Sequence, residues 1–165
     1  MSVNIEKIRT NLSILEYDNT VMLFDVIECF RMYGLFFRMS EELKEYMSEL
    51  GTEGRLIKIQ YEEIMLNKNE SFEALIRDYQ KGCVKIEKIV NKVKNLTKED
   101  LLDDEKILNL LGYDINVINL DEKIEPRGYG LLNNISKITK KDKETLIKEF
   151  SGVQSILAAS VQEIT

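Results

Sequence analysis

The residues best suited to chemistry gather in one short segment near the C-terminal end. The stretch EPRGYGLLNNISKITKKDKETLIKEF, residues 125–150, contains the one proline of the chain together with several lysines. Thr139, three residues ahead of Asp142, fits a capping box that starts a helix. Lysines beside the free amides of a helix N-terminus attract phosphate groups. The candidate phosphate contacts are Arg127, Lys137, Ile138, Thr139, Lys140, Lys141 and Lys143.

Two short helices joined by a tight turn must position these residues. We expect Pro126 at the first position of one helix, residues 136–139 in the turn, and a second helix from Lys140 to about Phe150. This is the shape of a helix-hairpin-helix, which contacts the phosphate backbone of DNA through its turn and the next amides. Such binding is sensitive to salt and largely independent of base sequence.

A second interpretation of the same segment stays open. The pattern also fits a solvated helix start whose lysines only keep the surface soluble. Thr139, as the cap, competes for one of the amides that a phosphate needs.

The rest of the chain has the opposite electrostatic character. The 165 residues include 23 Lys and Arg against 29 Asp and Glu, a formal net charge of −6. Residues 1–125 carry a net charge of −8, whereas residues 126–165 carry +2. Only this C-terminal part is therefore suited to a phosphate backbone.

Composition excludes several classes of site. The chain has no histidine, which removes histidine bases and most transition-metal sites. Cys29 and Cys83 lie far apart in apolar patterns, as expected for core residues in a reducing cytoplasm. The most apolar stretch, VMLFDVIECFRMYGLFFRM, contains four charged residues and is too polar to cross a membrane. We expect no catalytic residue, metal or cofactor in this chain.

Helical periodicity predicts an all-α fold in two parts. Residues 1–125 are expected to form an elongated helical spine, and residues 126–165 a small, truncated helix-hairpin-helix module. Apolar residues recur every three or four positions from Leu23 to Leu50, and again through residues 71–96. Residues 113–125 lack this period and are expected to form an extended connector, which marks the domain boundary.

Cap signals set the expected helix ends. The predicted N-caps are Thr97, Thr139, Ser151, Ser160 and, ahead of the first long helix, Asn19 or Thr20. Ser40 is expected to start a separate continuation of that helix. Gly51 and Gly112 are expected to end helices, because glycine accepts the left-handed conformation.

Five motifs carry a resemblance to a known family. They are ELGTEGRLIKIQYEEIM (49–65), LIRDYQ (75–80), ILNLLGYD (107–114), PRGYGLLNNI (126–135) and FSGVQSILAASVQEI (150–164). In this order, and over nearly the whole chain, the sequence resembles the DisA family of DNA integrity scanning proteins. The resemblance implies an N-terminal diadenylate cyclase domain that makes cyclic di-AMP from ATP with a divalent metal. It also implies a helical linker and a C-terminal helix-hairpin-helix module that prefers branched DNA.

The sequence departs from this family pattern in three ways. The cyclase signatures Asp-Gly-Ala and Arg-His-Arg are absent, so no cyclase activity is expected from this chain. The chain stops at Thr165, before the expected second hairpin with its Gly-Ile-Gly. Residues 135–139 read ISKIT where the family tends to have IPRLP, which keeps a positive charge but loses the stiffness of proline.

The resemblance therefore implies a non-catalytic linker and DNA-binding region of a bacterial checkpoint protein. It would bind the DNA backbone weakly by itself and couple that binding to cyclic di-AMP synthesis by the absent domain. Oligomers would form through the other domains of the parent protein, in the cytoplasm, at the nucleoid and without a membrane. The alternative is a purely structural or oligomerisation module that binds no DNA of its own.

Overall fold

The protein is described by a computed structural model over residues 21–52, 54–82, 84–116, 118–135, 138–150 and 152–160. These residues form helices and no strand, and one isolated antiparallel bridge joins Met22 to Lys123. The predicted all-α fold is confirmed. The predictions for Asn19, Thr20, Cys83, Lys137 and Ser151, and the capping box from Ser160 to Glu163, lie wholly or partly outside the described residues.

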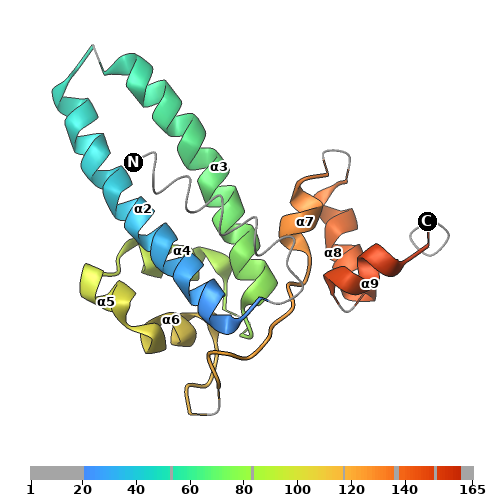
Figure 1. The fold of residues 1–165 in the computed structure, drawn as a ribbon. Helices are drawn as coiled ribbons and strands as arrows, with labels where there is room; N and C mark the ends of the chain where they lie inside the picture. Colours follow the sequence, from blue (N-terminus) through green and yellow to red (C-terminus); the bar gives the residue numbers. More distant parts are fainter. Residues whose placement is uncertain are drawn as a thin grey trace.

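Two long helices form the body of the molecule. Helices α2 (Leu23–Glu49) and α3 (Arg55–Tyr79) run side by side as a hairpin, with the turn at one end (Figure 1). Near its other end, Phe72 of α3 contacts three aromatic rings of α2. Its ring centroid lies 5.0 Å from Phe30, 4.6 Å from Tyr33 and 5.4 Å from Phe37. Aromatic pairs of this kind add about 0.5–1.5 kcal/mol each beyond the area that they bury.

Three short helices cover the base of this hairpin. They are α4 (Ile86–Lys94), α5 (Lys98–Leu102) and α6 (Asp104–Leu111). Gly34 lets α5 approach α2, since a Cβ atom there would lie 2.3 Å from the Leu101 side chain. Arg31 fixes the same contact by donating to the Leu101 carbonyl at 2.7 Å and to Asp104 at 2.6 Å.

The structure corrects three predicted helix boundaries. Pro126 does not start a helix, because the helix that follows it begins only at Tyr129. Ser40 starts no new helix: it is buried within α2, and its hydroxyl donates to the Phe36 carbonyl at 2.8 Å. The apolar stripe through residues 71–96 does not form one helix, because α3 ends at Tyr79 and α4 begins at Ile86.

The end of α6 explains why α3 stops. The backbone N–H of Lys81 donates to the Leu111 carbonyl at 2.8 Å. Gly112, with φ +80, packs so closely that a Cβ atom there would lie 2.7 Å from the backbone nitrogen of Gly82. This long-range contact has no signature in the local periodicity.

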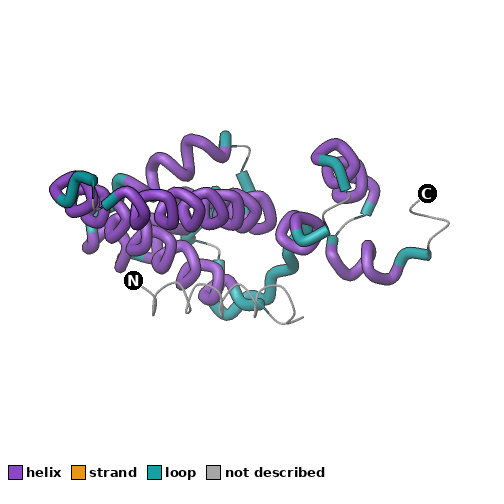
Figure 2. The backbone as a smooth tube through the Cα atoms, turned by 90° about the horizontal axis from the view of Figure 1, so that it is seen from above, coloured by secondary structure: helices purple, strands orange, loops and turns teal. Residues whose placement is uncertain are grey.

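A non-helical connector leads from the base of the bundle to the tail. It pairs with the start of α2, where Ile124 donates to the Val21 carbonyl at 2.9 Å and Leu23 donates to the Glu122 carbonyl at 3.0 Å. The tail helices, α7 (Tyr129–Asn133), α8 (Lys140–Glu149) and α9 (Val153–Ala158), lie beyond the C-terminal end of α3. Figure 2 shows them set apart from the bundle. None of the helices in the described ranges is long and apolar enough to span a membrane.

Candidate nucleic-acid interface

Helix α8 begins at the predicted capping box. The Thr139 hydroxyl oxygen accepts the Asp142 N–H at 3.3 Å, and the Asp142 carboxylate accepts the Thr139 N–H at 3.1 Å. The Thr139 hydroxyl also donates to that carboxylate at 2.6 Å. These hydrogen bonds hold the pKa of Asp142 below its usual value. The predicted box is therefore confirmed, and its acid is ionised at neutral pH.

Three lysines predicted to contact phosphate surround this start. Lys140 and Lys141 are exposed, and their backbone N–H groups have no acceptor among the residues that the structure describes. Lys143 is half-buried, and its Nζ atom donates to Asn133 Oδ1 at 2.9 Å, which ties α8 to α7. Helix α8 contributes no buried side chain of its own, so its whole first turn faces solvent or the neighbouring helix.

The other predicted contacts lie in different settings. Ile138 is half-buried and donates its N–H to the Ile135 carbonyl at 3.4 Å. Arg127 lies at the opposite end of α7, where its guanidinium donates to the carbonyls of Arg77 at 2.8 Å and Gln80 at 2.6 Å. The structure thus places the predicted contacts in residues 138–143 close together, and Arg127 lies apart from them. Their phosphate contacts remain predictions.

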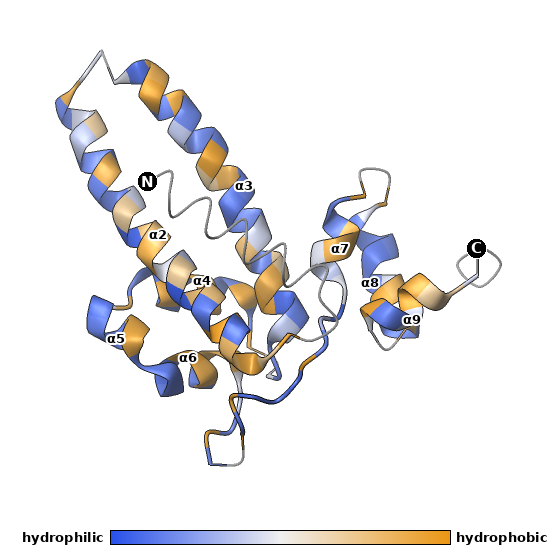
Figure 3. Cartoon of the chain, in the orientation of Figure 1, coloured by the Kyte–Doolittle hydropathy of each residue, from blue (hydrophilic) through white to orange (hydrophobic). Residues whose placement is uncertain are grey.

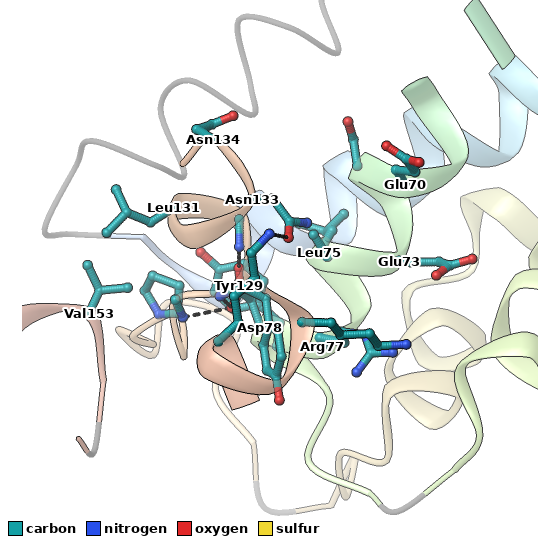
Figure 4. A pocket seen from close by; sticks show the side chains of 18 of the residues that line it. Glu70, Glu73, Leu75, Arg77, Asp78, Tyr129, Leu131, Asn133, Asn134 and Val153 are labelled. Atoms are coloured by element: carbon teal, nitrogen blue, oxygen red, sulfur yellow. Dashed lines mark hydrogen bonds between the residues drawn. The ribbon is translucent and has the colours of Figure 1, made fainter. Parts of the chain in front are cut away.

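A carboxylate that the sequence analysis missed attaches the tail to the bundle. Asp78 of α3 is only 7% exposed. One of its oxygens accepts the N–H groups of Gly128 at 2.8 Å and Tyr129 at 2.6 Å, and the other accepts that of Gly130 at 2.9 Å. A helix leaves its first amides without intrahelical partners, so Asp78 caps α7 from another helix. Figure 4 shows Asp78 beside Tyr129 in this arrangement.

Burial and hydrogen bonding act on Asp78 in opposite directions. Removal from water raises its pKa above the usual value, whereas the three amides and the nearby Arg127 charge favour the ionised form. The balance leaves the pKa raised. Both oxygens accept N–H bonds, so the bound form is the carboxylate.

Arg127 completes the attachment in the reverse sense. Its guanidinium donates hydrogen bonds to carbonyls at the C-terminal end of α3, where the helix dipole favours positive charge. The guanidinium of Arg77 also lies 5.4 Å from the centroid of the Tyr129 ring. Each helix end is therefore capped by a residue from the other segment. We name Asp78, Arg127 and the amides of residues 128–130 the α3–α7 joint.

The sequence contained one signal for Asp78. Its neighbours Leu75, Ile76 and Tyr79 all lie on the apolar stripe of α3 and are buried. A carboxylate on the buried side of such a stripe requires hydrogen-bond donors. Their identity could not be deduced, because they lie about 50 residues further along the chain.

A cavity of about 520 Å³ opens beside the joint, between α3, α7 and α8. Glu70 and Glu73 line its wall on α3, and Figure 4 shows both on that helix. Lys140, Lys143 and Glu144 line the facing wall on α8. No ion pair within 4 Å connects the two walls in the described ranges. The cavity thus separates an acidic surface from a mainly basic one.

Other reactive groups are scarce in the described part of the chain. No three Cys, Asp or Glu side chains there gather closely enough to hold a metal ion. Cys29 is buried in the core, as predicted, and burial together with the Asp25 charge raises its pKa to about 12. A thiol with this pKa is protonated at neutral pH and a poor nucleophile.

Comparison with known proteins gives a consistent result. Residues 2–120 match the family described as the DisA bacterial checkpoint controller linker region. The chain is 35% identical over 155 residues to the DNA integrity scanning protein DisA of Acetivibrio thermocellus, covering 93% of this chain and 43% of that protein. It is 34% identical over 162 residues to DisA of Carboxydothermus hydrogenoformans, covering 97% and 46%. For DisA of Clostridium botulinum strain Langeland the identity is 32% over 160 residues, covering 97% and 45%.

The chain spans less than half the length of these curated relatives. The family match covers most of the chain, from the segment ahead of α2 to the connector. The protein therefore belongs to the DisA linker family.

Proposed function

We propose that this chain is the linker of a DisA-type checkpoint protein together with part of its DNA-contacting tail. The observation that carries the proposal is the start of α8. There, two exposed lysines, Lys140 and Lys141, flank backbone amides that have no acceptor among the described residues. An anionic oxygen at this position gains hydrogen bonds, the helix dipole and the lysine charges together.

The mode of binding follows from these groups. Amides and lysines recognise phosphate and do not read base edges, so binding is independent of sequence. One capped helix start reaches few phosphates, so the affinity of this chain alone is weak and falls steeply with salt. Preference for branched DNA would arise in the whole protein, where several copies of the tail face one junction.

The linker would couple DNA binding to cyclic di-AMP synthesis in the whole protein, at the bacterial nucleoid. The α3–α7 joint supports this part of the proposal, because it fixes α7 to the last turn of a 25-residue helix. A movement of the tail would therefore tilt α3 and shift the far end of that helix. We propose no catalytic or cofactor role for the segment itself: with ATP and Mg²⁺ it is expected to yield no cyclic di-AMP.

A fluorescent four-way junction titrated at several salt concentrations tests the proposal. We expect saturable binding at about 50 mM salt, weakening linearly on a log–log plot. Lys140→Glu with Lys141→Glu should weaken binding by about tenfold or more and reduce the salt slope by about 2. The matched control is Lys92→Glu with Lys98→Glu, which makes the same change in charge at exposed positions of the bundle. Equal effects of both pairs, or no binding at low salt, would contradict the proposal.

A second candidate function, assembly, is favoured by a different observation. The far end of the α2–α3 hairpin exposes large apolar side chains. Figure 3 colours segments of both helices near the turn as hydrophobic. Tyr46 is 63% exposed and Leu56 is 66% exposed, with Leu50, Ile57 and Ile59 also exposed around them. A helix that presents apolar residues on several faces gains free energy by burying them.

The partner that fits this surface is a second copy of the chain. At this end of the hairpin α2 carries three acidic residues, Glu42, Glu45 and Glu49, and α3 carries two basic ones, Arg55 and Lys58. If two copies pack so that α2 of one lies against α3 of the other, opposite charges pair. Sedimentation velocity should then show a concentration-dependent dimer that Leu56→Glu with Ile59→Glu abolishes. A monomer at all concentrations would exclude this role for the hairpin end.

A further inference from the structure

The cavity between α3 and α8 has an uneven charge distribution. Glu70, Glu73 and Asp78 contribute negative charge on the α3 side, offset by Arg77, which lies against the Tyr129 ring. On the α8 side, Lys140 and Lys143 outweigh Glu144. Lys140, one of the two lysines proposed to hold phosphate, and the neighbouring Lys143 therefore face carboxylates of their own chain across open space.

We propose that Glu70 and Glu73 compete with DNA phosphate for the lysines of α8. This inference rests on the proposed function of α8. Without DNA, the acidic edge of α3 attracts Lys140 and Lys143 and lowers the positive potential that a phosphate meets. A bound phosphate replaces the carboxylates as the partner of these lysines, and α8 moves away from α3.

The attachment of the two tail helices permits this movement. Helix α7 is held to α3 by three amide bonds to Asp78 and two carbonyl bonds from Arg127. Helix α8 has no buried side chain, and among the described residues one side-chain hydrogen bond, from Lys143 to Asn133, joins it to α7. Helix α7 is thus the fixed member and α8 the one that can turn.

The strength of the competition is set by distance and screening. No ion pair within 4 Å bridges the walls among the described residues, so the lysines and glutamates interact across solvent. Such interactions extend over about one Debye length, about 10 Å at 0.1 M salt. The carboxylates therefore weaken phosphate binding at low salt without blocking it, and their effect fades as salt rises.

Neutralising the acidic wall tests the inference. Glu70→Gln with Glu73→Gln should tighten junction binding by about three- to tenfold at about 50 mM salt, and by less than twofold at high salt. The control is Glu62→Gln with Glu63→Gln, which makes the same change in charge on α3 about 14 Å away along the helix. An equal gain from both pairs would show that only net charge matters, and no gain from the first pair would also overturn the inference.

A DNA-free measurement separates this inference from the proposed function. Spin labels at Asn67→Cys on α3 and Lys148→Cys on α8, with Cys83→Ser and the buried Cys29 retained, report the distance between the helices. In the labelled chain with both glutamates, raising the salt concentration should lengthen this distance. In the labelled Glu70→Gln, Glu73→Gln variant, the distance should be long at every salt concentration. A distance that ignores both salt and these substitutions would overturn the inference. Salt-dependent distances without any DNA binding would instead overturn the proposed function and leave only the attraction between α3 and α8.

Discussion

Asp78 Oδ1 lies 2.6 Å from the backbone nitrogen of Tyr129, a residue 51 positions further along the chain. The contact joins LIRDYQ of α3 to PRGYGLLNNI of the tail, two of the motifs by which the chain resembles its family. One motif supplies a buried carboxylate and the other a helix start with unpaired amides. Motifs that look independent in the sequence are thus two halves of one structural unit.

Replacing Asp78 should detach the tail from the bundle. Asp78→Ala leaves three amides without an acceptor, and we expect the free energy of unfolding to fall by about 1–3 kcal/mol. Asp78→Asn keeps one oxygen but turns an NH₂ group toward one of the amides, so it should also lower the free energy of unfolding. Urea denaturation measures the change, and hydrogen exchange at residues 128–130 should accelerate. Asp121→Asn, an exposed position on the connector, is the control and should stay within about 0.5 kcal/mol.

Arg127 should matter through its shape as well as its charge. Its guanidinium reaches two carbonyls at once, at Arg77 and Gln80, which a lysine ammonium cannot reproduce. We expect Arg127→Lys to recover less than half of the stability lost in Arg127→Ala. A double-mutant cycle with Asp78→Ala should give a coupling energy above about 0.5 kcal/mol, because both residues hold the same joint. Strict additivity would indicate that they act independently.

Two glycines with positive φ offer a matched pair. Gly112→Ala adds a Cβ atom 2.7 Å from the Gly82 nitrogen at φ +80, whereas Gly51→Ala adds one into open space at φ +56. Both substitutions strain the backbone, at about 1 kcal/mol or more. Only Gly112→Ala also forces α3 and α6 apart, so its loss of stability in thermal or urea unfolding should be clearly larger. Equal losses would mean that the close approach to Gly82 contributes nothing.

The capping acids should titrate abnormally. Hydrogen bonds from Lys106 and Thr97 lower the pKa of Asp100 to about 2, and those from Thr139 lower the pKa of Asp142. The folded pKa lies below the unfolded one in both cases. The stability contributed by these caps is therefore present above about pH 4 and is lost as pH falls through the folded pKa. Carboxyl ¹³C NMR measures both values, and Thr139→Ala should raise the pKa of Asp142 while leaving that of Asp100 unchanged.

The helix ends that the sequence predicts correctly are set by local chemistry. The capping boxes at Thr97 and Thr139 and the left-handed end at Gly112 involve residues within three positions of one another. A residue pattern contains all the information about such a hydrogen bond. The start of α8, the centre of the candidate interface, was predictable for this reason.

Two of the three features that the sequence did not predict depend on distant contacts. The break after Tyr79 is imposed by Gly112, which follows α6. Ser40 lies inside α2 and does not start a helix, because its buried hydroxyl can donate to a carbonyl one turn back. Pro126 was expected at the first position of a helix, but α7 begins only at Tyr129, where Asp78 caps it. At Tyr79 and at Pro126 a partner far along the chain decides the local structure, whereas the Ser40 hydroxyl finds its acceptor within its own helix.

The α3–α7 joint also bears on where this protein can be divided for experiments. The family match ends at residue 120, ahead of both Ile124, which pairs with Val21, and the amides that satisfy Asp78. A fragment cut there would keep a buried carboxylate and discard all three of its donors. The smallest unit that folds as it does here therefore extends at least to residue 133. The ends of a fragment for expression are better chosen so that every buried hydrogen-bonding group keeps its partner than by the limits of sequence similarity.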